Sequence, residues 1–221
     1  MKRALIIGSS GGIGSAVTRH LQGRGWAVDG LSRRETGFDL TDDSVVDAQM
    51  SALGPGYDMI LIASGALEIG GAAPEKTVRS IDAKALADQF ALNAIGPALV
   101  LRHAARLLPK DRKSVVAALS ARVGSIGDNR LGGWTSYRAS KAALNQILRC
   151  TAIELARSHK QAVCVGLHPG TVSTPFTQKY SGQYPMVTPD AAARNLLAVI
   201  ENLKPDQTGG FYDWAGKTVP W

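Results

Sequence analysis

The sequence predicts a single α/β domain over residues 1–221, in which a mostly parallel central sheet is flanked by helices in a doubly wound arrangement. Three observations support this fold class. Short apolar runs typical of buried parallel strands alternate with segments of helical periodicity along the chain. A glycine-rich segment joins the first of these runs directly to a helical segment. The length of 221 residues suits one compact domain and leaves no room for a second large one.

Each predicted strand is a short apolar run bounded by glycine, proline or polar residues. These runs are Arg3–Ile7, Ala27–Leu31, Met59–Ile62, Ser114–Leu119 and Ala162–Leu167, and residues 209–214 are interpreted as a last strand followed by a tail. Their alternation with helices predicts parallel β-α-β crossovers. In such a sheet the ligand site lies beyond the carboxyl ends of the strands.

The predicted helices lie between these runs, where apolar residues recur with helical spacing. They cover Ile13–Gln22, Asp43–Leu53, roughly Ile81–Leu108, Tyr137–Ala156 and Asp190–Asn202. The last helix has a clear start signal. Thr188 suits the N-cap, and Pro189 stands where its missing N–H does no harm.

The composition is that of an ordinary globular protein and excludes disorder, collagen and coiled coil. Hydrophobic residues make up 45% and charged residues 19% of the chain, and the mean hydropathy is -0.02. The apolar runs end well short of the roughly 20 residues that cross a bilayer. The apolar start at Ala4–Ile7 stops at Gly8, which is too short for a signal peptide. We therefore expect a cytoplasmic protein that does not enter membranes.

Metal and nucleic-acid binding are not expected. Cys150 and Cys164 fit neither a zinc site nor a Cys-x-x-Cys motif, and the four histidines form no i, i+4 pair. The net charge of +7 comes without any run of five basic residues, and the basic cluster at 110–113 is interpreted as a solvated loop.

The glycine-rich segment Gly8-Ser9-Ser10-Gly11-Gly12-Ile13-Gly14 predicts a pyrophosphate site. Glycine removes the Cβ atoms that would collide with a phosphate, so backbone N–H groups and the helix N-terminus can approach it closely. The spacing is G-x-x-x-G-x-G. The alternative for this segment alone is tight packing between strand and helix.

The end of the second predicted strand favours NADP over NAD. An NAD site places an acidic side chain against the ribose 2′-hydroxyl, whereas Ser32 and Arg33 stand here and suit a 2′-phosphate. We expect no acidic side chain to oppose that phosphate. The alternative is a pair of arginines, Arg33 and Arg34, in solvent. Asp39 is a candidate acceptor for the adenine amino group, and Thr41 or Asp42 a candidate cap for the next helix.

Tyr137 and Lys141 form a candidate acid-base pair. Residues four apart share one face of a helix, so the two side chains point together. A phenol is a poor proton-transfer group at neutral pH, and a neighbouring ammonium is expected to lower its pKa. A Tyr-x-x-x-Lys pair taken alone is a weak signal.

Taken in chain order, these motifs resemble the short-chain dehydrogenase/reductase family over essentially the whole length. The resemblance implies a Rossmann fold. Ala63-Ser64-Gly65 stands where the family usually has an Asn-Asn-Ala-Gly turn, so both asparagines are missing. Asn93 resembles the helix asparagine that supports a proton relay, the alternative being a polar residue that eases a kink at Pro97. The segment 168–174 resembles the one that grips nicotinamide, with Thr174 on the carboxamide.

A second set of residues resembles the C-factor and sniffer-like subgroup, close to small carbonyl reductases: Ser120–Ile126 and Gly132-Gly133-Trp134. One position departs from the family. Its catalytic serine is commonly the second of a Ser-Ser pair three residues before glycine, and here that position is Ala121. Ser120 takes the role only if the backbone twists there, because adjacent side chains at a strand end point to opposite sides. Ser125 is the fallback.

The segment from Phe176 to Val187 resembles a trimmed substrate lid. Tyr180, Tyr184, Pro185 and Met186 provide apolar surface that would exclude water from a site. The alternative is an ordinary surface crossover. Assembly stays open, because a monomer and a homodimer both fit the sequence.

The function implied by the resemblance is that of an NADP(H)-dependent carbonyl reductase or alcohol dehydrogenase acting on a small-molecule carbonyl or alcohol. The alternative is a C-factor-like signalling or interaction protein that binds the cofactor but turns over little, motivated by Ala121. The predicted catalytic residues are Asn93, Ser120, Tyr137 and Lys141. The predicted cofactor contacts are Gly8, Ser10, Gly12, Ile13, Gly14, Ser32, Arg33, Asp39, Leu40, Ala63, Ser64, Gly65, Tyr137, Lys141, Pro169, Gly170, Val172 and Thr174.

Overall fold

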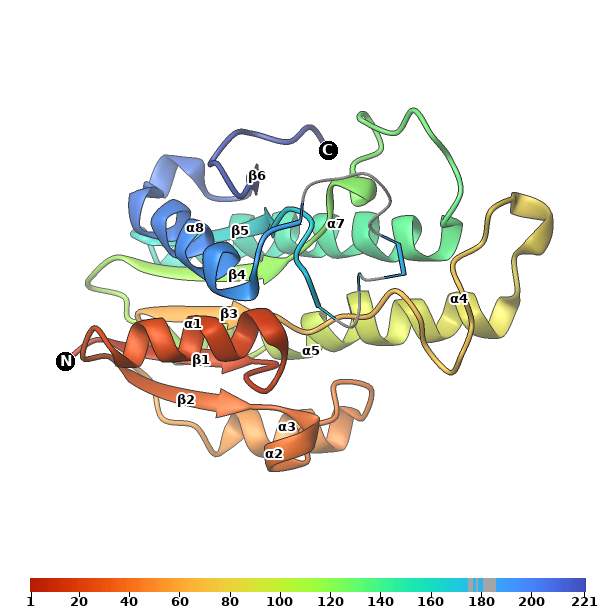
Figure 1. Cartoon of the computed structure of the whole chain (residues 1–221). Helices are drawn as coiled ribbons and strands as arrows, with labels where there is room; N and C mark the ends of the chain where they lie inside the picture. The colour runs from red at the N-terminus through yellow and green to blue at the C-terminus, as the bar shows by residue number, and fades with distance from the viewer. Residues whose placement is uncertain (175–176, 178, 181–185) are drawn as a thin grey trace.

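The computed structural model describes residues 1–174, 177, 179–180 and 186–221. Within these residues a six-stranded parallel sheet forms the centre of the molecule (Figure 1). Its strands are β1 (Arg3–Ile7), β2 (Ala27–Leu31), β3 (Met59–Ile62), β4 (Ser114–Leu119), β5 (Ala162–His168) and β6 (Phe211–Asp213), in the order β2-β1-β3-β4-β5-β6. After β2 the chain crosses over β1 to begin β3 on its other side. This change of direction is the switch point at which doubly wound sheets bind ligands.

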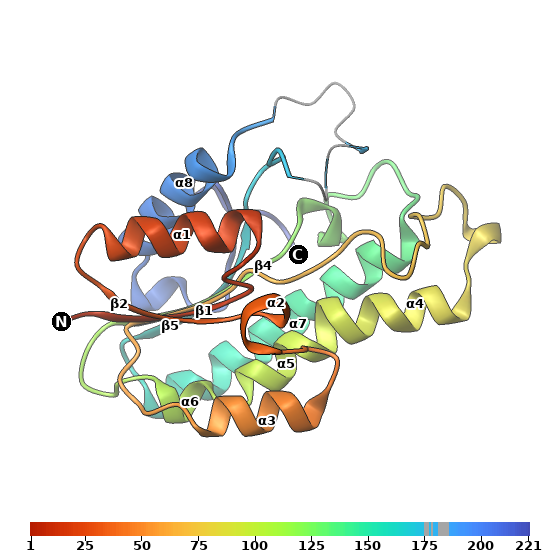
Figure 2. The same ribbon diagram turned by 60° about the horizontal axis from the view of Figure 1, so that its bottom comes forward.

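Helices cover both faces of the sheet. Figure 2 shows α1 (Gly12–Gln22) and α8 (Pro189–Asn202) on one face and the helices from the middle of the chain on the other. These are α3 (Asp43–Ser51), α4 (Ala83–Phe90), α5 (Gly96–Leu101), α6 (Ala104–Leu107) and α7 (Thr135–Ser158). Successive residues of β1 alternate between two buried clusters: Leu5 faces α3 and α5–α7, and Ile6 faces α1 and α8. The doubly wound fold class is therefore confirmed.

Most predicted elements differ from the structure by only one or two residues at their ends. The cap predicted for the last helix is present, because the Thr188 side chain accepts a hydrogen bond from the N–H of Ala191. Asp42, rather than Thr41, caps α3. The tail after β6 folds back on the domain, where the Trp221 ring stacks on Phe211 with centroids 5.8 Å apart.

The long helix expected at Ile81–Leu108 is the main difference. The chain instead forms α4, a π-helical turn at Ala91–Ile95, then α5 and α6. Pro97 contributes to the break, since it has no N–H to donate to the carbonyl of Asn93 four residues earlier. In the π turn the N–H of Gly96 bonds to Ala91, five residues back. The distortion lies at the residue that the family resemblance singles out.

The second difference from the predicted elements is an additional short helix at the edge of the sheet. A four-residue helix, α2 (Arg33–Thr36), follows β2 directly, capped by Ser32. No strand pairs with the outer side of β2 among the described residues, and Asp29 in the middle of the strand is exposed. The chain returns to the carboxyl end of β2 only at Phe38, whose N–H bonds to the Ser32 carbonyl at 3.2 Å. The sheet therefore ends beside the predicted 2′-phosphate site.

No helix in the described part of the chain combines the length and hydrophobicity needed to cross a membrane.

Candidate active site

The glycine-rich turn forms a close-packed cradle between β1 and α1. Gly8 has a φ of +85°, which favours glycine, and a Cβ on Gly14 would lie 2.1 Å from the Gly8 carbonyl oxygen. A Cβ on Gly12 would come within 3.0 Å of the Thr174 methyl group. Ser10 lies in the same turn, and Ile13 is the second residue of α1. The structure thus brings this turn and the predicted nicotinamide segment together at the carboxyl edge of the sheet.

The segment after β2 lies against this cradle. The N–H of Gly8 bonds to the Leu31 carbonyl at 2.7 Å, so Ser32 follows next to the turn. The Arg34 guanidinium donates to the Ser10 carbonyl at 3.3 Å. The Arg33 side chain is exposed and forms no hydrogen bond with the described residues. Two basic side chains therefore flank the place predicted for the adenine ribose.

One expectation about this place is wrong. The Glu35 carboxylate lies here and accepts hydrogen bonds from the hydroxyls of Ser32, at 3.2 Å, and Ser9, at 3.4 Å. The sequence contains the signal for this arrangement. Ser-x-x-Glu at 32–35 is a helix-start pattern, and it brings the glutamate back toward the serine. An acidic side chain does face the predicted 2′-phosphate position.

Asp39 accepts two hydrogen bonds from Thr41 rather than lying free. Its Oδ1 is 2.9 Å from the Thr41 N–H nitrogen and 2.7 Å from the hydroxyl. These bonds hold the pKa of Asp39 below its ordinary value, with a smaller contribution from the charge of Arg33. Leu40 is buried next to it, and its backbone packs against Gly96. The adenine role predicted for Asp39 stays a prediction.

Tyr137 and Lys141 project from the first turns of α7 into the interior. Their exposed fractions are 7% and 3%, and the Lys141 nitrogen lies 5.8 Å from the centre of the Tyr137 ring. The ammonium donates to the Leu119 carbonyl at 2.9 Å, at the end of β4. The pair is therefore close together, as the four-residue spacing predicts.

The electrostatics of the pair differ from the expectation. Burial raises the pKa of Tyr137 above its ordinary value, whereas the sequence-based expectation was a pKa lowered by Lys141. Burial also lowers the pKa of Lys141 to about 8. Both shifts have one cause, the removal of charge from water. Each side chain is thus driven toward its neutral form in the protein without a ligand.

Asn93 holds the turn that follows β3. Its Nδ2 donates to the Ala66 carbonyl at 2.8 Å, and its Oδ1 accepts from the Ala66 N–H at 3.0 Å. The side chain is completely buried. A Cβ on Gly65 would lie 2.9 Å from Asn93 Oδ1 and 3.2 Å from Lys141 Nζ. Ala63-Ser64-Gly65 therefore runs directly past both side chains, even without the two asparagines usual in the family.

The two candidate serines are both buried and both hydrogen-bonded. Ser120 donates to Asn145 Oδ1 at 2.6 Å, which directs its hydroxyl toward α7. Ser125 accepts from the Asp128 N–H at 3.1 Å. Ala121 lies between β4 and the 3₁₀ turn at Arg122–Gly124. The assignment of the carbonyl-orienting hydroxyl to Ser120 stays a prediction.

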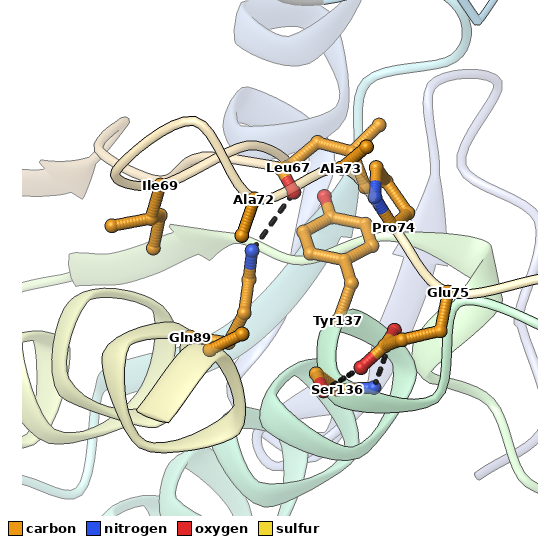
Figure 3. Close-up of a pocket in the computed structure, with 10 residues that line it drawn as sticks. Leu67, Ile69, Ala72, Ala73, Pro74, Glu75, Gln89, Ser136 and Tyr137 are labelled. Carbon is orange, nitrogen blue, oxygen red and sulfur yellow. Dashed lines mark hydrogen bonds between the residues drawn. The ribbon is translucent and has the colours of Figure 1, made fainter. Parts of the chain in front are cut away.

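A small cavity of about 10 Å³ lies beside Tyr137, close to the volume that one water molecule requires. Figure 3 shows the tyrosine ring between α7 and the segment from Leu67 to Glu75. Gln89 from α4 supports this segment, since its Nε2 donates to the Leu67 carbonyl at 2.8 Å (Figure 3). Most of the residues that line the cavity next to the phenol are apolar.

Glu75 is a site residue that sequence reasoning missed. Its carboxylate accepts from the N–H of Ser136 at 3.3 Å and also bonds to the Ser136 hydroxyl, one residue before Tyr137 (Figure 3). It therefore accepts from one of the N–H groups at the start of α7 that have no partner within the helix. The residue before that helix, Trp134, has a φ of +52° and makes no side-chain cap. No local signal identifies Glu75, because it lies 61 residues from Ser136 in the sequence.

The predicted lid is described only in part. Phe176, Tyr184 and Pro185 lie outside the described residues. The Tyr180 hydroxyl bonds to the Glu68 carboxylate, and its ring meets Trp134 edge to face at 5.7 Å. Lys179 also pairs with Glu68, at 3.2 Å. These contacts place Lys179 and Tyr180 against the loop that contains Glu68 and lines the cavity beside Tyr137.

The segment predicted to grip nicotinamide leads from β5 toward the cradle. Trp214 packs on Gly170, where a Cβ would lie 3.0 Å from the indole ring, and Pro169 precedes that turn. Val172 is buried and forms a bridge with Val187. Burial lowers the pKa of His168, at the end of β5, to about 4. Both tryptophans of the tail region, Trp214 and Trp221, thus contact their own chain.

A comparison with known proteins extends these observations. A family model described as enoyl-(acyl carrier protein) reductase matches residues 32–210. The 1-hydroxy-2-glutathionyl-2-methyl-3-butene dehydrogenase of Rhodococcus sp. is 30% identical, with 100% of both chains covered. C-signal of Myxococcus xanthus is 36% identical over 64% of this chain and 81% of its own.

Solved structures show the same arrangement. A short-chain dehydrogenase/reductase from Burkholderia multivorans with bound NADP superposes with a TM-score of 0.83 at 26% identity, covering 100% of this chain and 99% of that one. The NADPH-bound carbonyl reductase from chicken fatty liver gives a TM-score of 0.78 at 25% identity, with the same coverage. Both of those proteins hold the phosphorylated form of the nicotinamide cofactor.

Proposed function

Because the chain belongs to the short-chain dehydrogenase/reductase family, we propose that it is an NADP(H)-dependent oxidoreductase that interconverts a small carbonyl compound and its alcohol. The observation that carries this proposal is the buried pair of Tyr137 and Lys141, which lies at the carboxyl end of β4 and next to Gly65. A phenol and an ammonium at this position can move a proton to or from a substrate oxygen.

The cradle fits a dinucleotide. Its glycines leave no Cβ over the turn between β1 and α1, and the amide groups at the start of an eleven-residue helix face that space. Ser32, Arg33 and Arg34 at the end of β2 suit the 2′-phosphate that distinguishes NADP from NAD. When bound, the cofactor supplies the hydride.

The residues of this chain manage the proton and the geometry. In reduction, Tyr137 donates its phenolic proton to the carbonyl oxygen as negative charge develops there. Lys141 lies between Tyr137 and Gly65, where its ammonium can hold the ribose of the nicotinamide and stabilise the phenolate that remains. The raised pKa of Tyr137 keeps the phenol protonated before reaction. Asn93 fixes the Ala66 turn that borders the pair, and we assign the carbonyl-orienting hydroxyl to Ser120.

We place the substrate carbonyl against Tyr137, beside the apolar segment from Leu67 to Pro74, where the present cavity of about 10 Å³ must widen to admit it. The names of two similar proteins indicate carbonyl or alcohol substrates. One is a dehydrogenase of a hydroxylated glutathionyl compound, and the other is a carbonyl reductase. We therefore assign this chain a carbonyl or alcohol substrate of low polarity near the reacting carbon.

A second candidate is a cofactor-binding signalling protein with little turnover. Ala121 at the usual serine position and the hydrogen bonds that occupy Ser120 and Ser125 favour it. The similarity to C-signal is a further reason to test it.

The deciding experiment follows NADPH oxidation with a panel of aldehydes, ketones and quinones, using the wild type and Tyr137→Phe. We expect turnover in the wild type and a loss of at least about 10³-fold in Tyr137→Phe, with NADPH affinity nearly unchanged. Lys141→Ala is expected to weaken both affinity and rate. NADPH binding without turnover on any substrate would favour the signalling role, and undiminished turnover in Tyr137→Phe would refute the mechanism.

A further inference from the structure

The Glu35 carboxylate accepts hydrogen bonds from two serine hydroxyls that a cofactor phosphate would otherwise bind. Its Oε2 atom accepts from Ser9, in the glycine-rich turn, and from Ser32, at the end of β2. Both serines are buried, with exposed fractions of 8% and 4%. Because these side chains come from the two segments that meet at the adenine ribose position, the carboxylate lies where a 2′ substituent would be bound.

A carboxylate and a phosphate compete for the same donors. Each serine hydroxyl has one proton, and in this structure both protons are directed to Glu35. A phosphate that replaced the carboxylate would regain these bonds, but it would also bring close to two negative charges beside a third. A ribose 2′-hydroxyl differs, because it can donate a hydrogen bond to the carboxylate.

The carboxylate can leave without disrupting the local fold. The Glu35 side chain is 53% exposed. Ser32 caps α2 through the backbone N–H of Glu35, at 3.3 Å, so that bond does not depend on the glutamate carboxylate. The Arg34 guanidinium lies 3.8 Å from Oε1 and offers a partner on the solvent side. The exposed ion pair with Arg34 is weak, and the hydroxyls of Ser9 and Ser32 that Glu35 releases regain their hydrogen bonds from the incoming phosphate.

We propose that Glu35 is a specificity-determining residue that reduces the preference of this protein for NADPH over NADH. With NADH it remains in place and accepts the ribose 2′-hydroxyl, as the acidic residue of an NAD site does. With NADPH it swings toward Arg34, and Ser9, Ser32 and Arg33 receive the phosphate. This inference rests on the proposed NADP(H) site and assigns it a dual cofactor range.

The test uses two probes that lack nicotinamide, so that it does not depend on turnover. Adenosine 2′,5′-bisphosphate carries the 2′-phosphate and adenosine 5′-monophosphate does not. Isothermal titration calorimetry measures both on the wild type and on Glu35→Gln, which removes the charge and keeps the shape. We expect Glu35→Gln to bind the bisphosphate about tenfold more tightly and the monophosphate within about twofold of the wild type. The ratio of NADPH to NADH affinities, from fluorescence titration, should rise by the same factor.

Two further variants keep the result interpretable. Glu154→Gln makes the same charge change at an exposed position of α7 and should alter neither affinity. Glu35→Asp withdraws the carboxylate by one methylene group and should give a gain of about threefold, which preserves the test if Glu35→Gln folds poorly. Thermal unfolding checks each variant.

Failure of this inference is distinguishable from failure of the proposed function. If the wild type and Arg33→Ala bind the bisphosphate no better than the monophosphate, the NADP site itself is wrong. If Arg33→Ala weakens the bisphosphate selectively while Glu35→Gln changes neither probe, or both probes equally, only the role of Glu35 is overturned.

Discussion

The two ends of the cofactor site are built in opposite ways. The adenosine end consists of the Gly8–Gly14 turn with Ser32, Arg33, Arg34 and Glu35. The catalytic end consists of Asn93, Tyr137 and Lys141. Charged side chains at the adenosine end lie in water, with Arg34 75% and Glu35 53% exposed. At the catalytic end Asn93 is fully buried and Lys141 is 3% exposed.

This difference has an energetic meaning. Exposed ion pairs contribute about 0–1 kcal/mol, so single substitutions adjust selectivity at the adenosine end without disturbing the fold. A charge buried among apolar groups is penalised by the loss of water, and a change there costs several-fold more. Recognition of the cofactor is therefore adjustable, and the chemistry depends on a fixed interior. Four measurements test this contrast.

The largest effect concerns the buried ammonium of Lys141. Because burial lowers its pKa from 10.5 to about 8, the unfolded chain binds more protons than the folded protein between these two pH values. The free energy of unfolding due to this residue therefore rises with pH across that window, by up to about 3 kcal/mol in total.

Urea unfolding of the cofactor-free protein at pH 7.5 and pH 10.5 measures this, with Lys141→Met as the comparison. The free energy of unfolding of the wild type should rise relative to that of Lys141→Met as the pH increases. Comparing the two proteins cancels other groups that titrate here, such as Cys164, whose pKa burial raises to about 12. A difference that does not vary with pH would show that Lys141 is not effectively buried.

The next effect concerns the carbonyl-orienting hydroxyl. Ser120→Ala should lower kcat by roughly 100-fold, the scale of losing one placed donor to developing charge, and Ser125→Ala should change it little. Steady-state kinetics on the best carbonyl substrate compares the two. The opposite ranking would transfer the role to Ser125, whose oxygen already accepts from Asp128. If neither matters, Ala121→Ser becomes informative, and faster turnover in it would favour the signalling role.

A smaller effect is expected at the adenosine end. Arg33→Ala should weaken NADPH binding by about tenfold and leave NADH binding nearly unchanged, because it removes one exposed charge-assisted contact to the 2′-phosphate. Fluorescence titration at low and high salt provides the measurement. The loss should diminish as salt rises, since exposed charges are screened. A salt-independent loss would mean that this end is less open to water than the structure indicates.

The smallest effect tests the carboxylate at the start of α7. Glu75→Gln removes a negative charge from the helix N-terminus and should lower the free energy of unfolding by about 1 kcal/mol. The same experiment on Glu154→Gln, in an exposed position of the same helix, should show almost no change. Equal destabilisation in both variants would mean that Glu75 contributes nothing specific to the helix that carries Tyr137.

The same contrast explains what the sequence could predict. The Gly8–Gly14 turn and the Tyr137–Lys141 pair are local patterns, in which residues a few positions apart define both structure and chemistry. The structure brings these local patterns to one edge of the sheet. Glu75 and Gln89 escaped prediction because each acts on a residue far away in the chain. No property of residue 75 alone indicates that it will meet Ser136.

The break in the long predicted helix and the position of Glu35 both had a local signal in the sequence, but other features of the sequence favoured a different prediction. Pro97 stands four residues after Asn93, so a broken ladder at that carbonyl was predictable from the chemistry of proline. The resulting π turn, however, depends on packing that the sequence does not display. Glu35 belongs to a Ser-x-x-Glu pattern, yet the arginines beside it suggested a wholly basic site. Only the three-dimensional arrangement shows its carboxylate between Ser9 and Ser32.

The outer edge of β2 bears on self-association. An unpaired strand edge offers N–H and carbonyl groups to any extended segment of another molecule and can seed aggregation. Here the strand is only five residues long, and Asp29 at its centre bonds to the Tyr57 hydroxyl and to Arg3. A foreign strand added to this edge would lie against that exposed carboxylate and remove water from it. The Asp29 charge at this edge thus helps keep individual molecules apart at high concentration.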